Sequence, residues 1–254
     1  AQVIVEKIEW NESRFGYMTP VVIIKNPVKL AGVTVSRVSA HNARFLVDNK
    51  IGKGAVIEIT RSGDVIPKIM RTVKGSRVNP LPPGLGTKFD WNDTKVDLVS
   101  LSKNKSDSAV VDELVTFLIR IEVDKIKSNA IGKLVDYGIT TIPELIKTEV
   151  DEMMEAGLGH GTSAHLHDRM RQQLKAADIP TLMAASSIFG RGFGERKLGA
   201  ILGEVPFKQM LTLYKQGRPT LVERISVIPG IGRASAVSFV ASLPKFVKFL
   251  KEIN

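Results

Sequence analysis

The sequence predicts a multidomain protein in which a small all-β barrel precedes an all-helical domain. Within residues 30–70, the stretches around Val33 and Ile57 alternate apolar and polar side chains with a period of two, which is typical of half-buried strands. From Val110 onward, helical stretches punctuated by Gly or Pro replace this alternation. We therefore expect a barrel domain, a linker and a helical domain, at residues 1–75, 76–109 and 110–254.

The expected barrel has about five short strands and one short helix, as small partly open barrels do. Residues 2–10 and 21–24 predict the first two strands, and residues 39–48 suit the helix because they lack the alternation. The polar residues from Arg61 to Asp64 follow a strand. We expect them at a tight bend between two strands, where such barrels place functional groups.

The composition is that of a globular chain of 254 residues, 43% of them hydrophobic and 24% charged. No apolar run approaches the roughly 18 residues of a membrane span, and nothing indicates export, so we expect a cytoplasmic protein. The sequence contains no cysteine, which excludes disulfides, iron–sulfur clusters and cysteine-ligated zinc. We expect no metal site at His160, His165 and His167 either.

The net charge of +10 predicts an anionic partner, for which nucleic acid, a membrane surface and an acidic protein are the candidates. The charge is uneven along the chain. Twelve Lys or Arg stand against six Asp or Glu in residues 1–75, eight against twelve in residues 110–189, and eleven against four in residues 190–254. Two basic ends fit two contact surfaces on one long ligand; the alternative is that the charge only provides solubility.

Glycine pairs of the form Gly-x-Gly recur in the helical domain, 33 and then 38 residues apart, each before a helix-forming stretch. The pairs are Gly159 with Gly161, Gly192 with Gly194, and Gly230 with Gly232. Residues 126–131 occupy the place of an earlier repeat without its glycines. Such glycines allow a tight hairpin and bring backbone N–H groups to the start of the next helix, where they bind a phosphate without reading a base. The alternative for a single pair is a helix cap, but three in register favour phosphate sites.

Several motifs of the barrel lie in the order and spacing of a known family. They are Thr-Pro-Val at 19–21, Leu-Ala-Gly-Val-Thr-Val-Ser-Arg at 30–37, His-Asn-Ala at 41–43, Ile-Gly at 51–52 and Arg-Ser-Gly-Asp-Val-Ile-Pro-Lys-Ile at 61–69. Together they resemble the oligonucleotide-binding (OB) domain of NAD-dependent DNA ligases. The glycine repeats resemble helix-hairpin-helix motifs, which follow the OB domain in that family. The resemblance thus implies a small all-β OB barrel followed by an all-α tandem helix-hairpin-helix domain.

Two features of the family are missing from the sequence. Its four-cysteine zinc module cannot form without cysteine, so we interpret residues 76–109 as a linker that replaces it. The Lys-x-Asp-Gly motif, whose lysine carries AMP in the family's preceding adenylation domain, does not occur. We therefore expect one subunit of a ligase encoded in two pieces, as in T5-like bacteriophages. A fragment and a defunct remnant are the alternatives.

The resemblance implies that the chain binds nicked duplex DNA and positions the nick for a separate adenylation subunit, in replication and repair. NAD and Mg²⁺ are then bound mainly by that partner, no zinc is used, no membrane is involved, and the chain is inactive alone. A viral version works in the cytoplasm of its bacterial host. The alternative is a stand-alone duplex-binding module without sequence preference or ligase activity.

Basic side chains are the expected phosphate contacts, because a guanidinium engages a phosphate through two hydrogen bonds. They are Arg14, Arg37, Arg44 and Arg61 in the barrel and Arg191, Arg196, Lys197 and Arg233 beside the glycines. We expect the third and fourth hairpins to bind most strongly and the first repeat to be structural. The other OB motif residues are His41, Asn42, Gly63, Asp64, Pro67 and Lys68. His41 and Asn42 are candidates for a helix cap or a DNA contact, and we expect Asp64 to anchor its bend rather than to act in catalysis.

Overall fold

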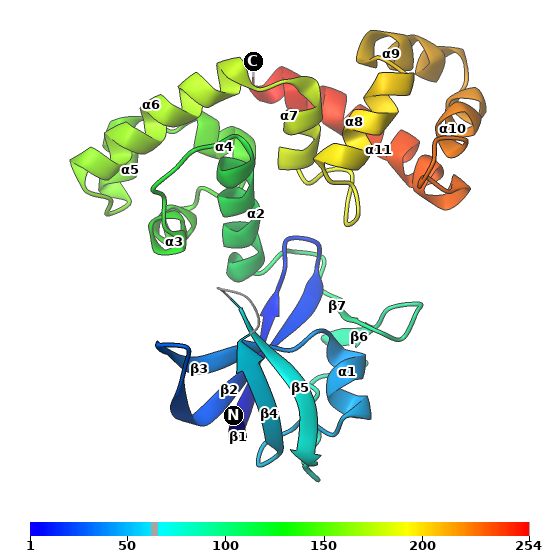
Figure 1. Cartoon of the computed structure of the whole chain (residues 1–254). Coiled ribbons are helices and arrows are strands. Elements are labelled where there is room, and N and C mark those ends of the chain that lie inside the picture. The colour runs from blue at the N-terminus through cyan, green and yellow to red at the C-terminus, as the bar shows by residue number, and fades with distance from the viewer. Residues whose placement is uncertain (62–65, 254) are drawn as a thin grey trace. The chain divides into compact units, whose positions relative to one another are not determined.

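A computed structural model of the chain describes residues 1–61 and 66–253, with the backbone alone at Arg61. The predictions for Gly63, Asp64 and the Arg61 side chain therefore lie outside the described residues. The chain divides into two compact units, Ala1–Ala109 and Val110–Asn254. Strands around one short helix build the first unit, and helices build the second (Figure 1). The predicted change from strands to helices is confirmed.

In its described residues, the first unit is a strongly bent antiparallel sheet of seven strands with the order β5-β4-β1-β2-β7-β6, and β3 pairs with β2. The long strand β2 pairs with three neighbours, and irregularities in its register with β1 and β3 let it bend. Strand β3 also lies beside β5, which is at one end of the strand order, and this contact closes the bent sheet into a barrel. The elements are β1 Gln2–Glu12, β2 Tyr17–Leu30, β3 Val33–Ser39, α1 Ala43–Asp48, β4 Val56–Arg61, β5 Pro67–Lys74, β6 Phe89–Trp91 and β7 Leu98–Ser100.

The barrel core follows directly from the alternation in the sequence. Ile57 and Ile59 of β4 point inward while Glu58 between them pairs with Arg71 at the surface. Helix α1 contributes Leu46, which is fully buried among the strand residues. The buried set consists of Val3, Val5, Val22, Ile24, Val35, Val38, Ala40, Leu46, Ile51, Ala55, Ile57, Ile59 and Ile69.

Much of the segment predicted as a linker packs on the barrel. Its strands β6 and β7 form an antiparallel ribbon, and Leu98 of β7 pairs with Met18 of β2. Leu98 is fully buried, and the partly buried Trp10 and Trp91 pack around it. The Trp10 indole N–H also donates to the carbonyl of Pro80 at 3.2 Å. Both tryptophans therefore have a packing role in the first unit.

The second unit consists of ten helices in the part of the chain that the structure describes, arranged as two successive groups of five. The first group is α2 Asp107–Arg120, α3 Ser128–Tyr137, α4 Ile142–Lys147, α5 Val150–Glu155 and α6 His160–Ala176. The second group is α7 Ile179–Ala185, α8 Glu195–Glu204, α9 Phe207–Gln216, α10 Arg218–Ser226 and α11 Arg233–Ile253. Each group ends with its longest helix, α6 or α11. No described helix is both long enough and apolar enough to cross a membrane.

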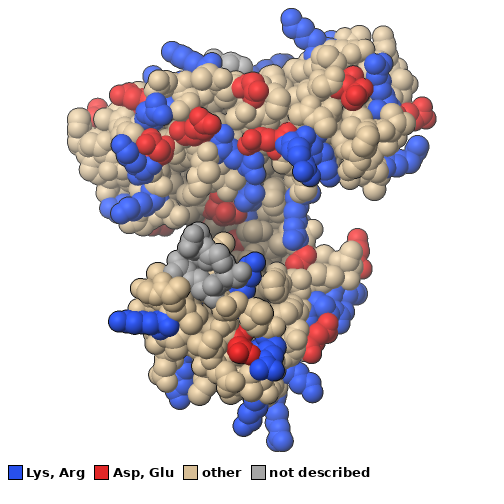
Figure 2. Space-filling view, viewed as in Figure 1, with Lys and Arg blue, Asp and Glu red and all other residues tan. Residues whose placement is uncertain are grey.

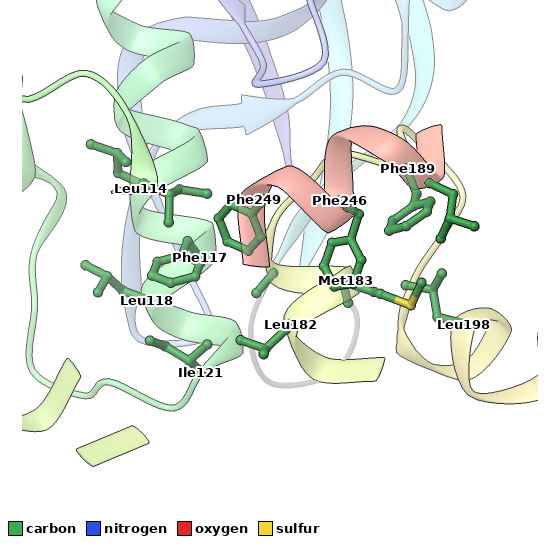
Figure 3. Close-up of a cluster of buried hydrophobic side chains, with 14 of the residues drawn as sticks. Leu114, Phe117, Leu118, Ile121, Leu182, Met183, Phe189, Leu198, Phe246 and Phe249 are labelled. Carbon is green, nitrogen blue, oxygen red and sulfur yellow. The ribbon is translucent and has the colours of Figure 1, made fainter. Parts of the chain in front are cut away.

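One continuous core joins the two groups of helices. Figure 3 shows α2 facing α7 and α11 through Phe117, Leu182 and Phe249. Helix α11 buries an apolar stripe at spacings of three and four residues, as a helix packed along one side does. Phe246 of this stripe packs among other aromatic rings. Its ring centroid lies 5.3 Å from that of Phe189 and 5.9 Å from that of Phe207.

Phe246→Ala should destabilise the helical unit by about 3–5 kcal/mol, because it removes a fully buried ring from a packed aromatic group and leaves a cavity. Guanidinium denaturation followed by circular dichroism at the helix band measures this change. Val237→Ala is the control, since Val237 is half-exposed on the same helix and its loss should change the stability little. Equal effects of the two changes would contradict this account of the core.

Candidate nucleic-acid interface

Four tight hairpins in the helical unit have the same three-residue form. The first residue has a positive φ, the second is apolar, and the third comes directly before a helix. Their φ values are +60°, +91°, +94° and +82° in chain order. We call them hairpins 1 to 4: Lys125-Ile126-Lys127 before α3, Gly157-Leu158-Gly159 before α6, Gly192-Phe193-Gly194 before α8 and Gly230-Ile231-Gly232 before α11.

The apolar residue anchors each hairpin and directs its backbone outward. Leu158 and Ile231 are buried, and Ile126 and Phe193 pack against the same core. The positive φ, which glycine adopts without strain, allows the chain to reverse just before this anchor. The start of the following helix is therefore held firmly at the surface.

The glycine that directly precedes each of α6, α8 and α11 has free space beside its Cα. A Cβ atom added at Gly159, Gly194 or Gly232 would meet no other atom within 4 Å. Among the described contacts, the residues before α6 and α8 offer no side-chain cap, whereas Asp178 accepts the N–H of Thr181 at the start of α7 at 2.9 Å. Helix N–H groups with open space in front of them and the positive end of the helix dipole can bind an anion.

The first glycine pair, which belongs to hairpin 2, lies two residues earlier than the sequence analysis predicts. Gly157 and Gly159 form hairpin 2, while Gly161 lies inside α6. The pairs Gly192 with Gly194 and Gly230 with Gly232 occupy their hairpins as predicted. A repeat without glycines was also expected near residue 126, and hairpin 1 provides it, with Lys125 in the conformation that glycine has elsewhere.

Basic residues flank the hairpins. Arg191, Arg196 and Arg233 are exposed within two residues of a hairpin glycine. The Lys197 ammonium lies 5.2 Å from the centre of the Phe193 ring, above the anchor of hairpin 3. Figure 2 shows Lys and Arg side chains on the helical unit interspersed with Asp and Glu. The local charge at each hairpin therefore depends on which acidic groups lie beside it.

Hairpins 1 and 2 share a basic cavity that the sequence analysis missed. It has a volume of about 290 Å³, and its lining includes Lys125, Lys127 and Lys133 together with Gly159. Lys133 Nζ donates to the carbonyl of Gly157 at 2.6 Å. The expectation of a purely structural first repeat did not include these lysines. One sequence signal could have revealed hairpin 1: an apolar residue lies between Lys125 and Lys127, as one lies between the two glycines of each other hairpin.

The barrel arginines with described side chains lie on separate elements, and each has a local contact. Arg37 on β3 forms an ion pair with Glu9 of β1 at 2.8 Å. Lys7, which hydrogen-bonds Glu9, and the neighbouring Arg37 hold the pKa of that carboxyl below its usual value. Arg14, in the β1–β2 turn, lies 4.5 Å from the centre of the Phe15 ring.

Arg44 ties α1 to the β6–β7 ribbon. Its Nε donates to the carbonyl of Lys95 at 2.9 Å, and its guanidinium lies 5.4 Å from the Trp91 ring. Its backbone N–H donates to the carbonyl of Val96 at 3.0 Å. Three contacts with one ribbon give Arg44 a clear structural role.

The remaining motif residues shape the barrel. Asn42 is the N-cap of α1, and its Oδ1 accepts the N–H of Phe45 at 2.8 Å. The His41 ring packs edge-on against Phe45, with centroids 4.7 Å apart. Pro67 and Lys68 begin β5, and Lys68 is exposed. Among residues 1–61 and 66–253, no group of three or more His, Cys, Asp or Glu is placed to hold a metal ion.

The bent antiparallel barrel with the short helix α1 defines an OB-type domain, a class that binds oligonucleotides and oligosaccharides. Residues 2–80 match the family described as the NAD-dependent DNA ligase OB-fold domain. The first unit therefore contains a domain of this kind, as the sequence resemblance predicts.

The homologues of the chain are DNA ligases from viruses and bacteria. The DNA ligase of Acanthamoeba polyphaga mimivirus is 32% identical over 253 residues, which are 99% of this chain and 39% of that protein. A putative DNA ligase of Invertebrate iridescent virus 3 is 31% identical over 78% of the chain and 26% of its own length. The DNA ligase of Psychromonas ingrahamii is 30% identical over 67% of the chain and 26% of its own length. The chain thus spans about two fifths or less of these relatives.

Asn42→Ala should destabilise the barrel by about 0.5–2 kcal/mol, because it removes the side-chain acceptor at the start of α1. Asn42→Asp keeps an acceptor there and should retain most of the stability. Chemical denaturation followed by tryptophan fluorescence measures both variants, since Trp10 and Trp91 report on the barrel. An alanine variant as stable as the unchanged chain would show that the cap contributes nothing.

Proposed function

We propose that this chain is the DNA-binding, nick-positioning subunit of an NAD-dependent DNA ligase and acts with a separate adenylation subunit. The OB-domain match and the ligase homologues support the reaction class. The observation that carries the DNA-binding role is the repeated hairpin, because four copies of one outward-facing backbone arrangement suit a ligand that repeats its charge. Such an arrangement fits the phosphates of duplex DNA.

In this proposal the hairpins are helix-hairpin-helix motifs. The N–H groups at the starts of α6, α8 and α11 bind phosphates, and Arg191, Arg196, Lys197 and Arg233 add charge to hairpins 3 and 4. The lysines of the cavity between hairpins 1 and 2 give the first half of the unit a phosphate site as well. Contacts of this kind position a duplex without reading its bases.

The OB barrel then grips the backbone around the nick. Arg14, Arg37 and Arg61 are the proposed phosphate contacts, while Arg44 acts by holding the β6–β7 ribbon. The barrel and the hairpins align the 3′-hydroxyl with the adenylated 5′-phosphate. The hydroxyl oxygen then attacks phosphorus and loses its proton to solvent, and AMP leaves as the phosphodiester forms.

This chain contributes alignment and charge to that step, effects that lower barriers by several kcal/mol in well-oriented reactions. NAD is a substrate and Mg²⁺ a cofactor of the whole complex, and both are bound mainly by the partner. The complex works on nicked duplex DNA in the cytoplasm, in replication and repair, as the split ligases of T5-like bacteriophages do.

A nick-sealing assay tests the proposal. Singly nicked duplex, NAD and Mg²⁺ are incubated with this chain, with a separately supplied adenylation domain of an NAD-dependent ligase, or with both. Sealing that requires both proteins is the expected result. If the added domain adenylates itself and this chain binds duplex, yet no tube seals the nick, the chain is instead a stand-alone duplex-binding module.

Gly232→Val should weaken binding to every duplex sequence alike, by about tenfold, because its side chain fills the space before α11 where a charge-assisted hydrogen bond to phosphate forms. The slope of log affinity against log salt should fall by about 0.9 for one lost phosphate contact. Fluorescence anisotropy with labelled duplexes measures both quantities.

Gly203→Val is the matched control for this change. It adds the same side chain to an exposed glycine of α8, also with no atom within 4 Å of the new Cβ, but away from the start of the helix. Unchanged affinity in a folded Gly232→Val protein would remove hairpin 4 from the interface.

A further inference from the structure

Hairpin 3 differs from the other three in the charge at its helix start. Glu195 is the first residue of α8, whereas the first turns of α3, α6 and α11 contain no acidic residue among those described. A carboxylate at this position interacts favourably with the helix dipole. It also repels any phosphate that approaches the same N–H groups.

Glu195 forms an ion pair with an arginine from a distant part of the chain. Arg120, the last residue of α2, donates from Nη1 to Glu195 Oε1 at 2.9 Å, across 75 positions of sequence. The Arg120 side chain is 31% exposed and that of Glu195 is 53% exposed. The ion pair therefore lies at the surface beside hairpin 3.

The surroundings of Arg120 are acidic. A cavity of about 280 Å³ beside the pair is lined by residues that include Arg120 and three acidic residues, Glu122, Asp178 and Glu195. Among the described lining residues, Arg120 is the single Lys or Arg. Without it, the described lining would hold three acidic residues and no Lys or Arg.

We propose that Glu195 lowers, and Arg120 restores, the affinity of hairpin 3 for a DNA phosphate. Arg120 is a positioning residue that acts through Glu195: it neutralises the carboxylate and draws it toward α2, away from the N–H groups of α8. The positively charged Arg196 and Lys197 then give the start of α8 a net positive charge. This inference rests on the proposed function, and it makes phosphate binding at hairpin 3 depend on the contact between α2 and α8.

The test is a double-mutant cycle with Glu195→Gln, Arg120→Gln and the double variant, measured by anisotropy with labelled nicked duplex at low salt. The exposed ion pair between Lys248 and Glu252, 3.4 Å apart in the last turns of α11, supplies the controls. Glu252→Gln and Lys248→Gln remove the same charges near the C-terminal end of α11, whereas hairpin 4 precedes the N-terminal end of this helix. Thermal melting by circular dichroism checks that every variant is folded.

Glu195→Gln should tighten binding about two- to fivefold, the effect expected of one charge at a helix start, and more than Glu252→Gln does. Arg120→Gln should weaken binding by a similar factor, and this loss should disappear in the double variant. An equal loss with and without Glu195 would make Arg120 a direct DNA contact and overturn the inference. So would equal effects of Glu195→Gln and Glu252→Gln.

Failure of this inference can be separated from failure of the proposed function. If the unchanged chain binds duplex DNA and Gly232→Val weakens that binding, the hairpin interface stands. If Glu195→Gln then leaves the affinity unchanged, only the proposed effect of Glu195 and Arg120 on hairpin 3 is overturned. If the unchanged chain does not bind duplex DNA, both fall together.

Discussion

The helical unit depends on one constraint, a chain reversal of three residues whose middle side chain is anchored in the core. At hairpin 4 the buried Ile231 supplies the anchor, and at hairpin 3 the Phe193 ring lies 5.8 Å from that of Phe239. The residue before each anchor must adopt a positive φ, and the residue after it begins a helix. Because the anchor belongs to the common core, the backbone N–H groups at the helix start are fixed in place. An arrangement that is fixed before binding loses little conformational entropy when it meets a ligand.

Some polar residues of the barrel stabilise its fold, and others are exposed at its surface. Arg44 and Asn42 hold α1, one by contacts with the β6–β7 ribbon and the other as its N-cap. The ribbon covers Leu98 with Trp91 and extends the sheet beyond β2. A segment without a metal site thus gains order by strand pairing and burial. Arg37 and Lys68 remain exposed on the strands beside this framework.

Local patterns predicted several strands of the barrel, the change to helices and part of the candidate site. The alternation around Ile57 identified β4, and the glycines of hairpins 3 and 4 were recognised by their spacing. Hairpin 2 was misplaced because Gly161 has the same spacing from Gly159 as Gly157 has, and spacing alone does not reveal which glycine has the positive φ. Lys125 was missed because a lysine rarely adopts that conformation. The DNA contacts of the arginines stay predictions.

The sequence by itself determined the order of strands and helices, the absence of cysteine chemistry and the basic charge, since these depend on residue type or on neighbours a few positions away. The tertiary structure alone decided which distant residues meet. The pairing of Met18 with Leu98 and the ion pair of Arg120 with Glu195 join segments about 80 and 75 residues apart. Such contacts arise from the packing of whole elements around a shared core, and no periodicity within either segment encodes them.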